Sequence, residues 1–224
     1  MSSRFTIIVA GGSGTRMQTS EPKQFIVLCG CPILMHTIRI FADYCKDMPV
    51  IVVLPAEHID LWKHLCQQYD FAIPHQVVEG GETRFHSVKN GLSALPDAGT
   101  VAIHDGVRPL VSRQVIADCF REAELHGNAV PAIPVVDSVR EIAEKGSRII
   151  DRSKLLLIQT PQVFDIGLLK KAYNREYTPE LTDDASVFEK AGHTIRLTNG
   201  NEENIKITTR NDLVVAEALM SLNL

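Results

Sequence analysis

Near its start the chain reads FTIIVAGGSGTRM over residues 5–17, and this stretch sets the architecture expected for the rest. Residues 5–9 form a short apolar run rich in β-branched side chains, which is typical of a buried parallel strand. Glycines follow this run immediately. Because open α/β sheets bind their ligands at the carboxyl ends of parallel strands, we expect a binding site at this loop.

The glycines of the loop suit a polyphosphate. Such a ligand must come close enough to accept hydrogen bonds from backbone N–H groups, and a Cβ at Gly11, Gly12 or Gly14 would block its approach. Arg16 and Lys23 add two fixed positive charges. The stretch therefore predicts a triphosphate-binding loop, the alternative being a glycine-rich turn with two solvated cations.

Two common phosphate-binding motifs do not match this loop. The dinucleotide-binding fingerprint requires a third glycine where Met17 stands and an acidic residue about 20 positions later, and neither is present. This excludes an oxidoreductase of the dinucleotide-binding type. The P-loop ends in Gly-Lys-Ser/Thr, whereas Thr15 and Arg16 occupy that place here.

The composition is that of a soluble globular protein, because the 224 residues are 45% hydrophobic and 22% charged. This length fits one domain over residues 1–224. The formal net charge of −4 is not that of a typical nucleic-acid-binding protein, which carries excess positive charge. No signal segment precedes the first strand, and no apolar run approaches the roughly 18 residues that span a membrane. Five cysteines without zinc or redox spacing indicate reduced thiols, so we expect a cytoplasmic protein with no membrane or nucleic-acid partner.

Strand and helix patterns alternate after the loop. Runs at 50–54, 77–79 and 100–103, which are mostly apolar, predict strands, and each is followed by apolar residues spaced as on one helical face. This alternation predicts βαβ units, and hence an α/β fold with a Rossmann-like, mostly parallel sheet flanked by helices.

The second half of the chain carries a helix, a strand and an arm. Ser112 and Gly127 predict the two caps of a helix. The strand expected at 129–136 contains prolines and should therefore lie near an edge of the sheet or at an exit from it. From about 137 to 158, two β-like runs flank Lys145-Gly146, which predicts a β-hairpin arm that projects from the sheet.

Residues 104–109 read HDGVRP directly after the strand at 100–103. An aspartate at the carboxyl end of a strand, facing a phosphate loop, is well placed to hold Mg²⁺, whose hard charge prefers carboxylate and phosphate oxygens. Asp105 is therefore a candidate ligand of Mg²⁺ or another divalent cation. The alternatives are a cap or turn for Asp105 and a structural ion pair for Arg108.

The runs AGGSGTR at 10–16, PKQ at 22–24 and HDGVRP at 104–109 resemble the signature of nucleotidyltransferases that join a sugar or polyol phosphate to a nucleotide. Among these, the chain is most similar to the 2-C-methyl-D-erythritol 4-phosphate cytidylyltransferases of the non-mevalonate isoprenoid pathway. The resemblance implies that CTP and 2-C-methyl-D-erythritol 4-phosphate give 4-diphosphocytidyl-2-C-methyl-D-erythritol and pyrophosphate, with Mg²⁺ as cofactor. It also implies a homodimer whose arms embrace, so that each active site borrows a residue from the other subunit.

The resemblance assigns roles to residues that match the family's motifs. The residues expected to hold the nucleotide are Ala10, Gly11, Gly12, Gly81, Glu82, Ser87, Asp105 and Gly106. The cations expected to act in catalysis are Arg16, Lys23, Arg152 and Lys206. The residues expected around the acceptor are Arg108, Asp137, Ser138, Thr182 and Asp183. The metal ligands would be Asp105 and Glu203.

Three of these assignments have a departure or an alternative. Glu203 stands where the family often has aspartate, and the neighbouring Glu202 is an alternative metal ligand. Ser138, the residue borrowed across the dimer, stands where the family usually has threonine, but the hydroxyl is kept. Thr182 and Asp183 open a helix, where an acidic first turn stabilises the helix dipole, so capping is an equally good explanation for them.

The expected reaction needs no general base. Arg16, Lys23 and a metal would surround one anion, while Arg152 and Lys206 would receive a second, which implies two phosphorylated substrates. A phosphate monoester carries a charge of about −1.5 to −2 near neutral pH, so it can attack the α-phosphorus of a nucleotide directly. Catalysis then consists of positioning and charge stabilisation.

Two alternatives stay open. A ribitol-5-phosphate cytidylyltransferase would share the glycine loop, the HDGVRP run and the motif at 203–208, but Asp151-Arg152 and the run at 182–186 favour the methylerythritol enzyme. A non-catalytic nucleotide-binding regulator could use the same scaffold. The presence of residues for both anion sites argues against it, because a pure binder has no need of the second.

Overall fold

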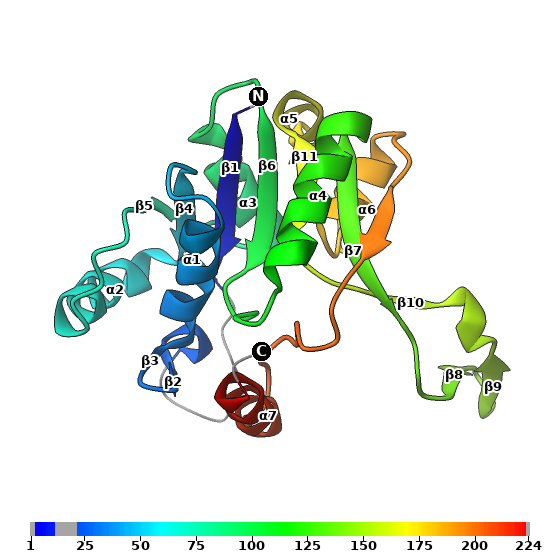
Figure 1. Ribbon diagram of the computed structural model, residues 1–224. Helices are drawn as coiled ribbons and strands as arrows, with labels where there is room; N and C mark the ends of the chain where they lie inside the picture. The colour runs from blue at the N-terminus through cyan, green and yellow to red at the C-terminus, as the bar shows by residue number, and fades with distance from the viewer. Residues whose placement is uncertain (1–2, 12–21, 223–224) are drawn as a thin grey trace.

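Three parallel strands form the centre of the sheet in the computed structural model, which describes residues 3–11 and 22–222. β1 (Arg4–Val9) lies between β4 (Val50–Leu54) and β6 (Thr100–Asp105) and runs parallel to both (Figure 1). The carboxyl ends of the three strands therefore meet at one edge, directly before the glycine loop.

The remaining strands extend this sheet on both sides. β5 (Gln76–Glu79) pairs in parallel with β4. On the other side, β11 (Gln162–Asp165) runs antiparallel between β6 and β7 (Asn128–Pro134). β10 (Leu156–Ile158) and β12 (Leu197–Asn199) also pair with β7, and they lie on opposite sides of it because both pair with Ala132. Within the described residues, the eight strands form one sheet in the order β10-β7-β11-β6-β1-β4-β5, with β12 beside β7. The predicted α/β, mostly parallel sheet is confirmed.

Helices cover both faces of the sheet. One face carries α1 (Ile33–Tyr44), α2 (Ala56–Gln68) and α4 (Arg113–His126), and the other carries α3 (Arg84–Ser93), α5 (Ile166–Tyr173) and α6 (Asp184–Lys190). β1 feeds both cores, because Ile8 packs with α1 and α4 while Ile7 and Val9 pack with α3. A strand that is buried on both faces has no polar side, which explains the continuous apolar run at 5–9.

The caps of α4 are those that the sequence predicts. The Oγ of Ser112 accepts a hydrogen bond from the backbone N–H of Val115 at 3.2 Å. Gly127 ends the helix with φ of +86°, a left-handed conformation that glycine adopts without Cβ strain. Between these caps, Ile116 and Phe120 are fully buried, and burial of one such side chain stabilises the fold by about 1.5–3 kcal/mol.

The prediction that β7 lies near the edge of the sheet is confirmed, and the chain leaves the sheet for the arm directly after it. β7 is nevertheless paired on both sides, although Pro131 lies in its middle. Its pairing with β11 covers only Asn128 and Ala129, so no partner on that side needs an N–H at Pro131. On the same side the carbonyl of Pro131 accepts a hydrogen bond from the N–H of Gln159 at 2.8 Å. Proline is tolerated here because it removes a donor that the ladder does not use.

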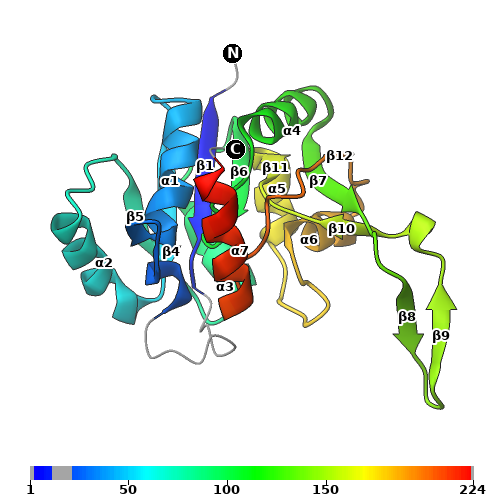
Figure 2. The same ribbon diagram turned by 60° about the horizontal axis from the view of Figure 1, so that its bottom comes forward.

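The predicted hairpin arm is present and projects away from the sheet (Figure 2). It consists of β8 (Val139–Ile142) and β9 (Ser147–Ile150), joined at Gly146 with φ of +82°. The residues of β10 pair with β7, so they belong to the main sheet and the free part of the arm is shorter than 137–158. Ile142 and Ile149 lie on the same face of the hairpin and are 89% and 73% exposed.

A small third core lies outside the two main layers. α7 (Arg210–Ser221) packs against the hairpin of β2 (Val27–Leu28) and β3 (Cys31–Pro32), with Ala216 and Ile207 fully buried between them. Among the described residues, no helix combines the length and the apolar character that a membrane span requires.

Candidate active site

A hollow of about 180 Å³ opens at the carboxyl edge of β1 and β6. Its walls come from the ends of both strands, from the loop before α3, from the segment after the glycine loop and from the segment before α7. The lining residues are Val9, Ala10, Gly11, Lys23, Gln24, Gly81, Glu82, Thr83, Arg84, Ser87, Asp105, Val107 and Lys206. Most of the residues predicted to hold the nucleotide are therefore brought together, from segments far apart in the sequence.

Close backbone packing explains two glycines of this site. A Cβ added to Gly106 would lie 2.9 Å from the Cβ of Ala10, and one added to Gly81 would lie 2.4 Å from the Cβ of His86. The N–H of Gly106 also donates to the carbonyl of Val9 at 2.9 Å, which ties the end of β6 to the end of β1. A larger residue at either glycine would push the walls of the hollow apart.

Ser87 supports the loop before α3. The N–H of Gly81 donates to its Oγ at 3.1 Å, and the Oγ lies 3.4 Å from the carbonyl of the same glycine. Thr83 caps α3 by accepting from the N–H of His86. This is an ordinary helix start, and Glu82 and Ser87 nevertheless line the hollow.

Asp105 lies among three cations. The Nζ of Lys206 is 2.9 Å and the Nε of Arg108 is 3.3 Å from its Oδ2, while the Nε of Arg84 is 3.6 Å from its Oδ1. Burial by itself would raise the pKa of the Asp105 carboxyl, but the charges of Arg84, Lys206 and Arg108 outweigh it and hold this pKa well below its ordinary value. Asp105 is therefore a carboxylate at every physiological pH.

His104 and Thr160 fix the backbone on which Asp105 sits. The Nε2 of His104 lies 3.0 Å from the carbonyl oxygen of Arg108, which can only accept, so Nε2 carries the proton. Its Nδ1 therefore accepts from the hydroxyl of Thr160 at 3.1 Å. The Oγ1 of Thr160 in turn accepts from the N–H of Asp105 at 3.1 Å. This chain of bonds joins β6 to the start of β11.

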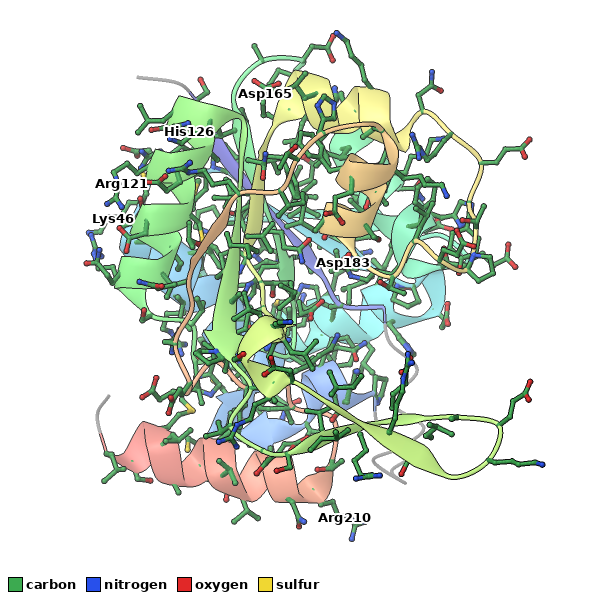
Figure 3. All side chains as sticks on the ribbon, turned by 90° about the vertical axis from the view of Figure 1, so that its right-hand side faces the viewer. Lys46, Arg121, His126, Asp165, Asp183 and Arg210 are labelled. Atoms are coloured by element: carbon green, nitrogen blue, oxygen red, sulfur yellow. The ribbon has the colours of Figure 1, made fainter. Side chains whose placement is uncertain are left out.

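Asp183 is the N-cap of α6 (Figure 3). Its Oδ1 accepts from the N–H of Ser186 at 2.9 Å, and its Oδ2 accepts from the Nε2 of Gln162 at 2.8 Å. The capping explanation is thus confirmed for Asp183, and both of its oxygens have a protein partner. Thr182 beside it is exposed.

The other predicted residues lie elsewhere. Asp137, Ser138 and Arg152 are exposed and lie on the arm or at its base, so none of them lines the hollow of this chain. The guanidinium of Arg152 donates to the carbonyl of Val136. The assignments of Gly12 and Arg16 fall outside the described residues.

Comparison with known proteins identifies the family. The model of the 2-C-methyl-D-erythritol 4-phosphate cytidylyltransferase family matches residues 5–222. A protein of that name from Bacteroides fragilis is 52% identical over 217 residues, which cover 97% of this chain and 99% of the relative. The chain belongs to the 2-C-methyl-D-erythritol 4-phosphate cytidylyltransferase family. The predicted family and enzyme class, a nucleotidyltransferase, are both confirmed.

Solved structures of cytidylyltransferases in this family share the fold. The chain superposes on 4-diphosphocytidyl-2C-methyl-D-erythritol synthase from Anaerococcus prevotii with a TM-score of 0.82 and 28% identity, covering 98% of this chain and 96% of that one. For the 2-C-methyl-D-erythritol 4-phosphate cytidylyltransferase from Francisella tularensis, the TM-score is 0.81 and the identity 30%, covering 97% of this chain and 99% of that one.

The side chains of this cytidylyltransferase can hold the expected divalent cation only if oxygens of a substrate complete its ligands. Among the described residues, no three His, Cys, Asp or Glu side chains gather as a metal-binding group. Glu203 lines a separate, larger hollow of about 800 Å³ near α1, α4 and α7, where it accepts from the Nδ2 of Asn201 at 3.1 Å. Asp105 and Glu82 are the carboxylates that line the smaller hollow, and Asp105 is the one at the end of β6. One carboxylate together with nucleotide phosphates is a common way of holding Mg²⁺, so Asp105 fits that role.

Arg84 is the residue of this cytidylyltransferase that the sequence reasoning missed. It lines the hollow and contacts Asp105, but the sequence reasoning gave it no role. The sequence feature that could have pointed to Arg84 is its place as the first residue of α3, directly after the loop that contains Gly81. Which way an arginine at a helix start points depends on a partner far along the chain, here Asp184.

Proposed function

We propose that this chain transfers the cytidylyl group of CTP to 2-C-methyl-D-erythritol 4-phosphate, with release of pyrophosphate. The products would be pyrophosphate and 4-diphosphocytidyl-2-C-methyl-D-erythritol. The observation that carries the proposal is the hollow in which Lys23, Lys206 and Asp105 converge at the carboxyl edge of the sheet. In a chain of this family, that arrangement supports a site for a nucleotide triphosphate beside a second phosphate.

Positive charge would do most of the catalytic work. Lys23 and Arg16 would stabilise the charge that grows on the α-phosphoryl oxygens and on the departing pyrophosphate. Lys206, whose side chain is 40% exposed, would receive the phosphate of the acceptor. That phosphate is already a nucleophile near neutral pH, so the residues need only orient it in line with the leaving group.

We assign Asp105 as the protein ligand of the Mg²⁺ that this reaction would use. When bound, the cation would supply further positive charge to the phosphoryl oxygens, and the phosphates of CTP would complete its ligand set. Arg108 has a supporting role in this proposal, because it donates to the carbonyl of Asn204 at 2.7 Å as well as to Asp105. It would hold the segment before Lys206 against the end of β6.

We also propose that the chain acts as a homodimer through its arm. The arm exposes Ile142 and Ile149 on one face, and apolar side chains so exposed commonly mark an interface. A second copy of the chain would bring its own Ser138 and Arg152 toward the acceptor side of the hollow. This would explain why neither residue lines the hollow of its own chain.

The decisive experiment is pyrophosphate release by the purified protein with Mg²⁺ and CTP. Release should require 2-C-methyl-D-erythritol 4-phosphate and be absent without an acceptor. Lys23→Ala should lower the rate by about 10²–10³-fold, the effect of removing one donor that stabilises transition-state charge. Lys46→Ala, which removes an exposed lysine after α1, should leave the rate unchanged.

Other outcomes would decide between the alternatives. Release with ribitol 5-phosphate in place of the methylerythritol substrate would indicate the ribitol enzyme. Tight binding of CTP without release for either acceptor would indicate a regulator. Near-normal turnover of a folded Lys23→Ala variant would contradict the catalytic assignment.

A further inference from the structure

Arg84 connects the end of β6 with the start of α6. It is the first residue of α3, its side chain is 27% exposed, and it lines the nucleotide hollow. One of its neighbours is Asp105 at the end of β6, and the other is Asp184 at the start of α6. Its guanidinium therefore bridges the two carboxylates.

The contact with Asp184 anchors the guanidinium. The Nη2 of Arg84 donates to the Oδ2 of Asp184 at 2.6 Å, and the hydroxyl of Tyr173 donates to the Oδ1 at 2.6 Å. Asp184 is fully buried, so its charge has no water to replace the arginine. Breaking a buried pair leaves an uncompensated charge, which makes this end of the bridge the fixed one.

The other end of the bridge reaches one particular oxygen of Asp105. Lys206 and Arg108 both contact Oδ2, whereas Arg84 contacts Oδ1. Each oxygen of the carboxylate thus has a cationic neighbour, and the carboxylate plane is set from two sides. Of these three cations, Arg84 is the one that lies on the Oδ1 side.

We propose that Arg84 is a positioning residue, which fixes the orientation of the Asp105 carboxylate for a nucleotide bound with its divalent cation. The proposal rests on the function proposed above, because it takes Asp105 as the protein ligand of that cation. Arg84 acts through Asp105, and Asp184 and Tyr173 act through Arg84. The same bridge holds the start of α6, where Thr182 and Asp183 lie, in a fixed position relative to the nucleotide hollow.

The test compares CTP binding with and without the cation by titration calorimetry. Arg84→Lys keeps the charge, but an ammonium group cannot span both carboxylates as a guanidinium does. We expect the variant to bind CTP roughly tenfold more weakly in Mg²⁺ and with wild-type affinity in EDTA. The Mg²⁺ concentration at half-maximal activity should rise by a similar factor.

Two further variants test the bridge: one should weaken CTP binding in Mg²⁺ by a smaller factor, and the other is a control. Tyr173→Phe removes one hydrogen bond to Asp184 and keeps the ring that stacks on Phe85 at 4.7 Å, so it should change binding in the same direction by a smaller factor. Arg4→Lys is the matched control, since it breaks a two-bond pair with Glu124 at the opposite end of β1. It should leave both binding constants unchanged.

If Arg84→Lys does not fold, the double variant Arg84→Gln with Asp184→Asn removes the buried charge together with its partner, and it should show the same metal-dependent loss. The proposal is overturned if the folded variant binds CTP in Mg²⁺ as the wild type does, or if it loses affinity equally in EDTA. Wild-type protein that does not bind CTP at all would instead contradict the proposed function.

Discussion

His104 is enclosed between Phe41, whose ring centroid lies 4.9 Å away, and the hydroxyl of Thr160. Burial lowers the pKa of His104 to about 4. The unfolded chain, with an ordinary histidine pKa near 6.5, therefore binds this proton more readily than the folded protein does. The contribution of neutral His104 to the free energy of unfolding is therefore complete above about pH 6.5, and it is lost as the pH falls toward about 4.

The direction of this pH dependence gives a prediction for His104→Gln. Between about pH 7 and pH 5, the free energy of unfolding of the wild type should fall by about 2 kcal/mol more than that of the variant, because only the wild type carries the depressed histidine. Urea unfolding of both proteins at the two pH values measures this difference. His126→Gln removes an exposed histidine and should behave as the wild type does. Equal pH dependence of His104→Gln and the wild type would contradict the prediction.

Single residues show how far the sequence could predict the site. Asp105 could be predicted because its place at a strand end follows from local pattern alone. Arg108 and Lys206 were expected in the site from the resemblance, but their convergence on Asp105 together with Arg84 could not be predicted, because the three cations come from different segments. Glu203 illustrates the limit, since it lies three residues before Lys206 in sequence but lines the other hollow.

Among the elements, α7 has its own stabilising device. The Oδ2 of Asp212 accepts from the N–H groups of Thr208 and Thr209 at 2.8 Å each, and the hydroxyl of Thr209 accepts from the N–H of Asp212. Together these bonds form a capping box at the start of α7. Because α7 covers Ile207, the cap also holds the segment that carries Lys206.

Asp212→Ala should therefore loosen α7 without unfolding the sheet. Loss of the cap costs about 1–2 kcal/mol, so the amides of α7 should exchange their hydrogens roughly tenfold faster in mass-spectrometric exchange experiments. The KM for the acceptor phosphate should also rise. Asp118→Ala, at a partly exposed position on α4, should change neither quantity. Wild-type exchange in α7 of the Asp212 variant would show that packing alone holds this helix.

At the scale of the whole molecule, the proposed homodimer would depend on the arm. Ile142→Glu combined with Ile149→Glu would place two charges on the face that we propose to be an interface. We expect a dimer for the wild type and a monomer for the variant in sedimentation velocity. The variant should keep its affinity for CTP but lose at least tenfold in rate with the acceptor. Leu125→Glu, on an exposed part of α4, is the control and should stay dimeric. A dimeric and fully active variant would contradict the proposal.

The order of the strands could be predicted only in part. The parallel strands near the start follow from alternation of strand and helix, which is a local pattern. The insertion of β11 between β6 and β7 depends on pairing between residues far apart in the chain, and the prolines of β7 indicated only that this strand lies near the edge of the sheet. Long-range pairing leaves little trace in local periodicity, so the sequence predicted the class of the sheet and missed this neighbour relation.

The position of β11 also determines when the central sheet can form during synthesis of the chain. β6 and β7 are made one after the other, but they become joined only when residues 162–165 arrive between them. Until the ribosome has added that segment, each of the two strands has an open edge with unpaired N–H and C=O groups, which can pair with other chains. A nascent chain that stalls within the arm would therefore be prone to aggregate, and it would lack the Thr160 hydroxyl that accepts from the backbone of Asp105.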